Sequence, residues 1–125
     1  MKKLIFILSA LFLISYNSVE GQTTSCSQLI EYVYKNGTSK DVIDNGLQIN
    51  SEWLKKVEAF SIENKIVVIA EMYTDKSHYS TKKYIYCDVP PFNWDSFYNS
   101  RMLILNTTLG ERFHQYVVDY KCNCN

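Results

Sequence analysis

Hydrophobic side chains recur along this chain with two different periods, and together these periods predict an α+β domain. Residues 26–36 carry apolar side chains at helical spacing and end before Gly37, which predicts a short N-terminal helix. Residues 66–73 form a nearly continuous β-branched run, which is typical of a central strand buried on both faces. Residues 82–88 alternate instead, with Tyr84, Tyr86 and Asp88 on one face and Ile85 and Cys87 on the other.

Three strands are predicted, and we expect them to form a small antiparallel sheet. The first runs from Trp53 to Phe60, although the helical spacing of Trp53, Leu54 and Val57 competes with this assignment. A turn at residues 61–65 leads to the central strand, and a polar hairpin tip at residues 74–81 leads to the third. Residues 38–50 carry only isolated apolar side chains, so we expect a connecting segment there.

Two helices are predicted after the sheet. Pro90 and Pro91 remove two amide donors and therefore end the third strand. Asn93 is placed to cap a short helix with its rings on one side, and Thr108 with Glu111 has the spacing of a capping box. Residues 102–105 are too short an apolar run to assign. The terminal helix is predicted to pack across the sheet through Phe113, Tyr116, Val117 and Tyr120.

The first 21 residues have the form of a secretory signal peptide. Lys2 and Lys3 precede an apolar run of about a dozen residues, which is too short to span a bilayer comfortably. Cleavage after Gly21 would leave a helix and connecting segment over residues 22–49 and a domain over residues 50–125. We expect an exported protein, periplasmic or secreted, with no transmembrane anchor after cleavage; lipid attachment at Cys26 is the alternative.

Composition restricts the class of partner. Loss of residues 1–21 leaves 11 of the 13 basic and 12 of the 13 acidic side chains, a net charge near −1. Nucleic-acid binders usually carry a basic excess on one face, so a protein partner is favoured over a nucleic acid. Ten Tyr, six Phe and two Trp fit a core whose polar-tipped rings reach its rim.

Four cysteines predict a disulfide framework in an exported chain of this size. A bridge between Cys122 and Cys124 would be strained, because one residue separates them. We therefore expect the tail to be linked twice, once to Cys26 and once to Cys87. A zinc site built from Cys87, Cys122, Cys124 and a histidine, either His78 or His114, is the alternative, but its spacing is atypical.

No constellation in the sequence defines a reaction. The chain has no nucleophile elbow, no glycine-rich phosphate loop and no singled-out carboxylate pair, so we expect neither catalysis nor a cofactor. His114 lies where it could meet Asp88 or Asp119, but a histidine at the rim of the core is the simpler interpretation. The one basic and aromatic cluster is Lys76, Lys82 and Lys83 with Tyr79 and Tyr84, and it fits a solvated hairpin.

Several of these features together resemble the KTSC domain family, named after a domain found at the C-terminus of some lysyl-tRNA synthetases. The matching pattern is Ser51-x-x-Leu54-x-x-Val57-x-Ala59-Phe60, a strand at residues 66–73, Tyr84-x-Tyr86-x-x-Val89-Pro90, an aromatic helix, and Gly110-x-x-Phe113-x-x-x-Val117-x-x-Tyr120. The resemblance covers about residues 50–121. It departs from the family at residues 101–105, an apolar insertion, and in the last helix, where Arg112 is the remaining basic residue.

The resemblance implies a binding domain, and the residues suggest two kinds of partner. We expect a non-catalytic module whose protein-contact surface comprises Tyr84, Tyr86, Trp94 and His114. The alternative, suspected for the family, is nucleic-acid binding by the same face with Lys76, Lys82, Lys83 and Arg112. An exported enzyme that uses His114 with a cysteine is a third hypothesis, and it requires a free thiol.

Overall fold

The structure is a computed structural model that describes residues 24–44, 51–103 and 106–125. The predicted signal peptide, its cleavage site and the second half of the apolar run at 102–105 lie outside these residues. None of the described helices is long and apolar enough to cross a membrane.

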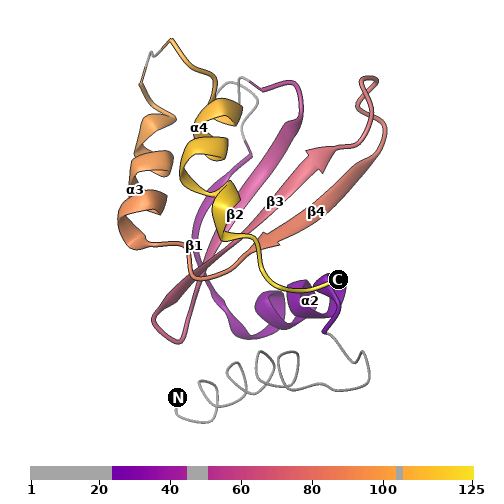
Figure 1. Ribbon diagram of the computed structural model, residues 1–125, viewed down its shortest axis with the longest axis vertical. Helices are drawn as coiled ribbons and strands as arrows, with labels where there is room; N and C mark the ends of the chain where they lie inside the picture. The colour runs from indigo at the N-terminus through magenta and orange to yellow at the C-terminus, as the bar shows by residue number, and fades with distance from the viewer. Residues whose placement is uncertain (1–23, 45–50, 104–105) are drawn as a thin grey trace.

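A four-stranded antiparallel sheet forms the centre of the fold, in the order β1–β2–β3–β4 (Figure 1). The strands are β1 (Thr38–Ile43), β2 (Leu54–Ile62), β3 (Lys65–Tyr73) and β4 (Thr81–Tyr86). The α+β class is therefore confirmed, but the three-strand prediction was wrong by one strand. The additional strand is β1, which lies within the segment expected only to connect.

Strand β1 has a weak sequence signal because it is an edge strand with a single buried side chain. Ile43 is buried, whereas most other side chains of β1 are exposed. The register with β2 also shifts between Ser39 and Asp41, which interrupts the alternation expected of a strand. Pairing with β2 therefore defines β1, rather than a hydrophobic period of its own.

Helices cover both faces of the sheet. Helix α2 (Cys26–Asn36) begins at a capping box of Ser25 and Gln28 and buries Leu29 and Val33. Helices α3 (Pro91–Ser100) and α4 (Leu109–Tyr116) and the 3₁₀ turn η1 (Val118–Tyr120) cover the opposite face. Figure 1 shows α3 and α4 side by side at one end of the molecule and α2 near the C-terminus at the other.

Two hydrophobic clusters result, one on each face of β3. The larger cluster contains Trp94, Phe97 and Phe113 from α3 and α4, and the smaller contains Leu29 and Val33 from α2. Residues 66–70 of β3 are all buried, which confirms the prediction of a central strand covered on both faces. Burial of this kind is the main favourable contribution to folding.

The helix ends are partly as predicted. Thr108 and Glu111 form the expected capping box, with the Thr108 hydroxyl accepting from the Glu111 amide at 3.1 Å. Asn93, in contrast, does not cap α3, which already begins at Pro91; its side-chain amide instead donates to the Tyr116 carbonyl at 3.0 Å. The terminal helix also ends at Tyr116, earlier than its hydrophobic stripe suggests, and continues as η1.

Candidate binding surface

Two disulfides fix the C-terminal tail, as the sequence predicted, and the structure assigns the pairing. Cys26 is bonded to Cys124 and Cys87 to Cys122, with Cα–Cα distances of 5.0 and 4.9 Å. Directly before Cys122, Lys121 forms an isolated antiparallel β-bridge with Tyr86 of β4. The tail is thus held along the end of β4, and disulfides of this kind indicate an oxidising, non-cytoplasmic environment.

The oxidised cysteines also bear on two alternatives from the sequence. All four cysteines lie in the described part of the chain, and none of them carries a free thiol there. In this state no cysteine can act as a nucleophile with His114, since the thiolate is the reactive form. The same sulfur atoms cannot supply thiolate ligands to zinc while they are bonded to each other.

Placement of the tail creates an aromatic and basic surface around Tyr84. The Tyr84 ring lies half-buried on the face of β4 that carries α4. The Nζ atom of Lys82 lies 5.3 Å from the centre of that ring, and the Nζ atom of Lys121 lies 5.8 Å from it. Both distances fall within the range of a cation–π contact. We call Lys82, Tyr84 and Lys121 the Tyr84 surface.

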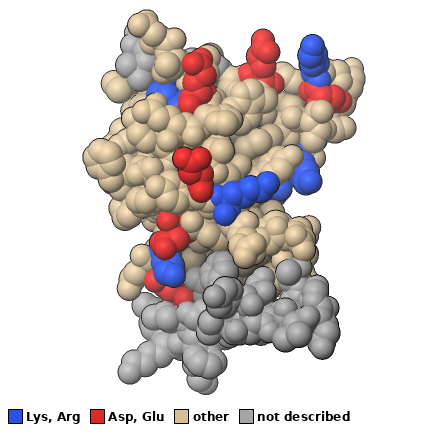
Figure 2. Space-filling model, in the orientation of Figure 1, with Lys and Arg blue, Asp and Glu red and all other residues tan. Residues whose placement is uncertain are grey.

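Figure 2 shows this side of the molecule. Most of the visible surface is uncharged, and blue side chains gather over β4 and the tail beside it. Lys121 was not among the site residues expected from the sequence, because its position depends on the Tyr86 bridge and the Cys87–Cys122 disulfide. The sequence around Lys121 does not indicate which aromatic ring its side chain will approach in the folded protein.

Three residues expected on the contact surface are buried instead. Tyr86 is 4% exposed and packs edge-on against Phe113 at 5.3 Å between ring centres. Trp94 is 0% exposed and donates its indole N–H to the Asp41 carboxylate at 2.7 Å. Arg112 is 5% exposed. In this conformation these side chains are parts of the interior, so an exposed binding surface does not include them.

Arg112 has a structural task that explains its burial. Its guanidinium donates to the Ser100 hydroxyl at 2.8 Å, to the Ser100 carbonyl at 3.3 Å and to the carbonyl and hydroxyl of Thr107. The planar group with five N–H donors can serve several acceptors at once. Arg112 therefore ties the end of α3 to the segment that enters α4, and its charge is withdrawn from the surface.

Lys83 belongs to the other face of the sheet. Its Nζ atom lies 4.7 Å from the centre of the Tyr34 ring and donates to the Tyr34 hydroxyl at 3.1 Å. That hydroxyl in turn donates to Glu58 at 2.8 Å. Burial, and then the hydrogen bond and charge of Glu58, raise the pKa of Tyr34 above its ordinary value. Of the predicted site residues, the structure therefore brings Lys82 and Tyr84 together and leaves Lys83 on the opposite side.

His114 is exposed, and among the described residues its ring contacts Trp53 rather than Asp88 or Asp119. Its ring centre lies 6.2 Å from that of Trp53, in an edge-to-face arrangement. Trp53 also packs edge-on against Phe113 at 6.1 Å. Beneath it lies Gly110, where an added Cβ atom would lie 3.0 Å from the Trp53 ring and 2.5 Å from the Ser51 hydroxyl. The position thus requires glycine for close approach.

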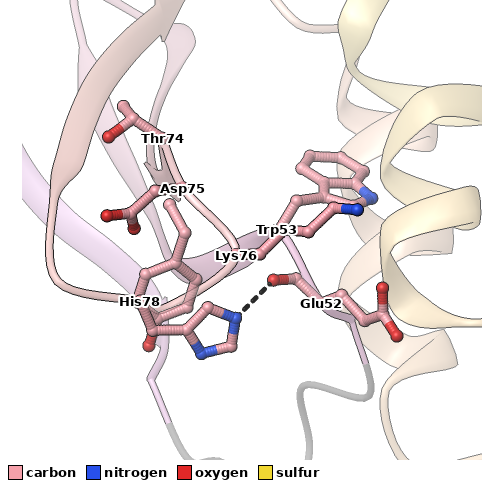
Figure 3. A pocket seen from close by; sticks show the side chains of 7 residues that line it. Glu52, Trp53, Thr74, Asp75, Lys76 and His78 are labelled. Carbon is pink, nitrogen blue, oxygen red and sulfur yellow. Dashed lines mark hydrogen bonds between the residues drawn. The ribbon is translucent and has the colours of Figure 1, made fainter.

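A hollow of about 610 Å³ opens beside Trp53, and the sequence did not reveal it. Figure 3 shows Thr74, Asp75 and His78 of the β3–β4 hairpin on one side of this hollow and Glu52 and Trp53 on the other. The remaining lining residues are Tyr73 and Lys76. No sequence motif marks the hollow, because its two sides meet only when β2 and β3 pair.

The hairpin tip has a defined conformation. His78 has a positive φ of 63°, donates from Nε2 to the Glu52 carbonyl at 2.9 Å, and stacks on Tyr73 with ring centres 3.9 Å apart. The Asp75 carboxylate accepts from the Ser77 hydroxyl at 3.0 Å and from the Tyr79 amide at 3.1 Å. Desolvation raises the pKa of Asp75, but the hydrogen bonds that its carboxylate accepts together outweigh this effect, and the pKa lies below its ordinary value.

Comparison with known protein families, curated proteins and solved structures found no match for this chain. The similarity to the KTSC family therefore rests on the residues quoted from the sequence. The chemistry of the site is that of a half-buried tyrosine ring near two lysines, together with the hollow beside Trp53.

Proposed function

We propose that this protein is an exported, non-catalytic binding domain of the KTSC type, and that it holds a protein partner against the Tyr84 surface. The two disulfides support export, since such bonds persist in oxidising compartments. The Gly110 contact with Ser51 and Trp53 supports the KTSC assignment, because it joins two elements of the quoted pattern.

The observation that carries the proposal is a half-buried tyrosine ring, Tyr84, with two lysine side chains within cation–π distance of it. A tyrosine supplies a large contact area with only two side-chain torsions to fix, which is why tyrosines are enriched at binding hot spots. Lys82 and Lys121 add positive charge close to the ring. A complementary partner would place an apolar or aromatic side chain on the ring and carboxylates opposite the lysines.

The sheet offers a matched control for testing this surface. Tyr34 and Lys83 form another tyrosine–lysine pair, but on the opposite face of the sheet. Tyr84→Ala with Lys82→Ala removes the proposed surface, whereas Tyr34→Ala with Lys83→Ala removes an equal number of similar groups elsewhere. Thermal unfolding of both variants would establish that each remains folded.

The experiment is affinity capture from the cell-envelope and secreted fractions, with the disulfide-bonded chain as bait. We expect a partner that the wild-type chain and the Tyr34/Lys83 variant both retain and that the Tyr84/Lys82 variant loses. If the Tyr84/Lys82 variant retained every partner of the wild-type chain, the proposal would be wrong.

The same geometry supports nucleic-acid binding as a second candidate. A base can stack on an accessible part of a tyrosine ring while lysines hold the neighbouring phosphates. Tyr84 would supply the ring, and Lys82 and Lys121 would supply two phosphate contacts. Two phosphate contacts on a single strand predict a slope of about −1.4 for log affinity against log salt concentration. Binding that does not change with salt, or no binding at low salt, would exclude this candidate.

A further inference from the structure

We propose that the β3–β4 hairpin is a self-association surface, on which Tyr79 of one copy enters the hollow beside Trp53 of a second copy and the exchange is reciprocal. This inference concerns the tip of the hairpin and does not depend on the function proposed for the Tyr84 surface. It rests on an exposed ring, an adjoining hollow and the charges at its rim.

The ring is presented by an ordered tip. Tyr79 is 89% exposed, the highest exposure among the large hydrophobic side chains of the described residues. Its backbone is nevertheless fixed, because the Tyr79 amide donates to Asp75 at 3.1 Å and the adjacent His78 is held by Glu52 and Tyr73. An aromatic side chain on a preordered backbone loses little further freedom when it binds, which favours association.

The hollow suits an aromatic side chain. Its volume of about 610 Å³ lies within the roughly 300–1,000 Å³ of typical binding pockets, and it is lined by Trp53 and the stacked pair of Tyr73 and His78. Aromatic rings pack favourably against one another in offset or edge-on geometry, beyond the area that they bury. In Figure 3 the Asp75 carboxylate is turned away from Trp53, so it does not place its charge beside that ring.

A second copy is the partner that the charges favour. An interface with two-fold symmetry requires each interacting group and its complement on the same surface. The hairpin side of the molecule carries both halves of two such pairs: the Tyr79 ring with the hollow, and the exposed side chains of Glu52 and Lys76, two residues that line that hollow. In Figure 3 the Glu52 carboxylate is directed away from the hairpin, at the outer side of the hollow. Around a two-fold axis, Glu52 of each copy can face Lys76 of the other.

The ring and the lining residues of the hollow also lie close together along the chain. Tyr79 lies within three residues of Lys76 and next to His78, so the ring and the hollow adjoin each other in every copy. A single two-fold axis near the hairpins can therefore bring both reciprocal contacts together. Because such an interface is small, we expect a weak dimer with a dissociation constant on the order of 10 µM.

Sedimentation velocity of the exported, disulfide-bonded chain provides the test, at loadings from about 1 µM to about 500 µM around the expected constant. We expect the sedimentation coefficient to rise from that of a monomer to that of a dimer. Tyr79→Ser should raise the dissociation constant at least about tenfold, and Tyr79→Phe should not. The matched control is Phe92→Ser, a comparable loss at a ring 77% exposed on α3, which should leave the dimer intact.

Charge reversal distinguishes a reciprocal dimer from nonspecific association through an exposed ring. Glu52→Lys alone would place lysine opposite lysine, and Lys76→Glu alone would place glutamate opposite glutamate, so each variant should be monomeric. An equimolar mixture of the two should dimerise again, because each contact then joins opposite charges. A chain that is monomeric at every loading would overturn the proposal, as would a mixture that shows no recovery.

Discussion

Removal of the disulfide between Cys26 and Cys124 should cost this domain a large part of its stability. The sequence separations are 98 residues for that bridge and 35 for Cys87–Cys122, which lies inside it. When the inner bridge is intact, the path from Cys26 to Cys124 can bypass the inner 35 residues through one step across the inner bond. The outer bridge, with a sequence separation of 98, then closes a loop of about 64 residues. In the chain-entropy model that closure is worth about 4.3 kcal/mol, and closure of the inner loop about 3.8 kcal/mol.

These magnitudes matter because domains of this size are stable by only about 5–15 kcal/mol. We therefore expect the variant Cys26→Ala with Cys124→Ala to fold but to lose about 4 kcal/mol in free energy of unfolding. The variant Cys87→Ala with Cys122→Ala should lose a similar amount. Removal of both bridges should leave much of the chain unfolded, since the two losses together approach the total.

Urea unfolding provides the assay, followed by tryptophan fluorescence and by far-UV circular dichroism. Trp94 is buried and reports on the core between the sheet and the helices α3 and α4, whereas circular dichroism reports on the whole chain. Coincident transitions would license a two-state free energy. A loss below about 1 kcal/mol for the Cys26/Cys124 variant would contradict the loop-closure reasoning.

Two further predictions concern buried hydrogen-bonding groups. Asp41→Ala leaves the indole N–H of fully buried Trp94 without its acceptor, so urea unfolding should show a loss of about 1–3 kcal/mol. Asp41→Asn keeps an acceptor oxygen and should therefore lose less stability than Asp41→Ala. Equal free energies of unfolding for these two variants would contradict the role given to this hydrogen bond. Burial, and secondarily the charge of Tyr84, raise the pKa of Tyr86 to about 12. In the unfolded chain the Tyr86 hydroxyl loses its proton near pH 10, whereas in the folded chain it keeps the proton until about pH 12. The free energy of unfolding should therefore fall between pH 10 and pH 12, by at most about 1.4 kcal/mol per pH unit. Tyr86→Phe should remove that component from stability measured between pH 9 and 12, and an unchanged pH dependence would refute the assignment.

The helices and the central strand were predictable because their signals are local. Thr108 and Glu111 form a capping box three residues apart, and the buried run of β3 lies within a single strand. Such contacts depend on spacing along the chain, which the sequence states directly. The presence of disulfides was predictable for a similar reason, since four cysteines in a small domain that is predicted to be exported leave few other uses.

The pairing of those cysteines was not predictable. The alternative pairing, Cys26 with Cys122 and Cys87 with Cys124, would close loops of almost the same lengths, so loop entropy does not choose between them. The choice depends on the Tyr86–Lys121 bridge and on the Cys122 amide, which donates to the Ile85 carbonyl at 3.2 Å. These contacts place Cys122 beside Cys87.

The sequence by itself therefore determined the class of fold, the helices that carry capping signals, the buried central strand and the linkage of the tail. Only the tertiary structure decided which rings and charges reach the surface. Buried Trp94 has its indole N–H satisfied by Asp41, 53 residues away, and Lys83 donates to the hydroxyl of Tyr34, 49 residues away. The hollow likewise needs Glu52 beside His78, 26 residues apart. Partners at such separations are set by strand register and helix packing, and neither is encoded in the spacing of neighbouring residues.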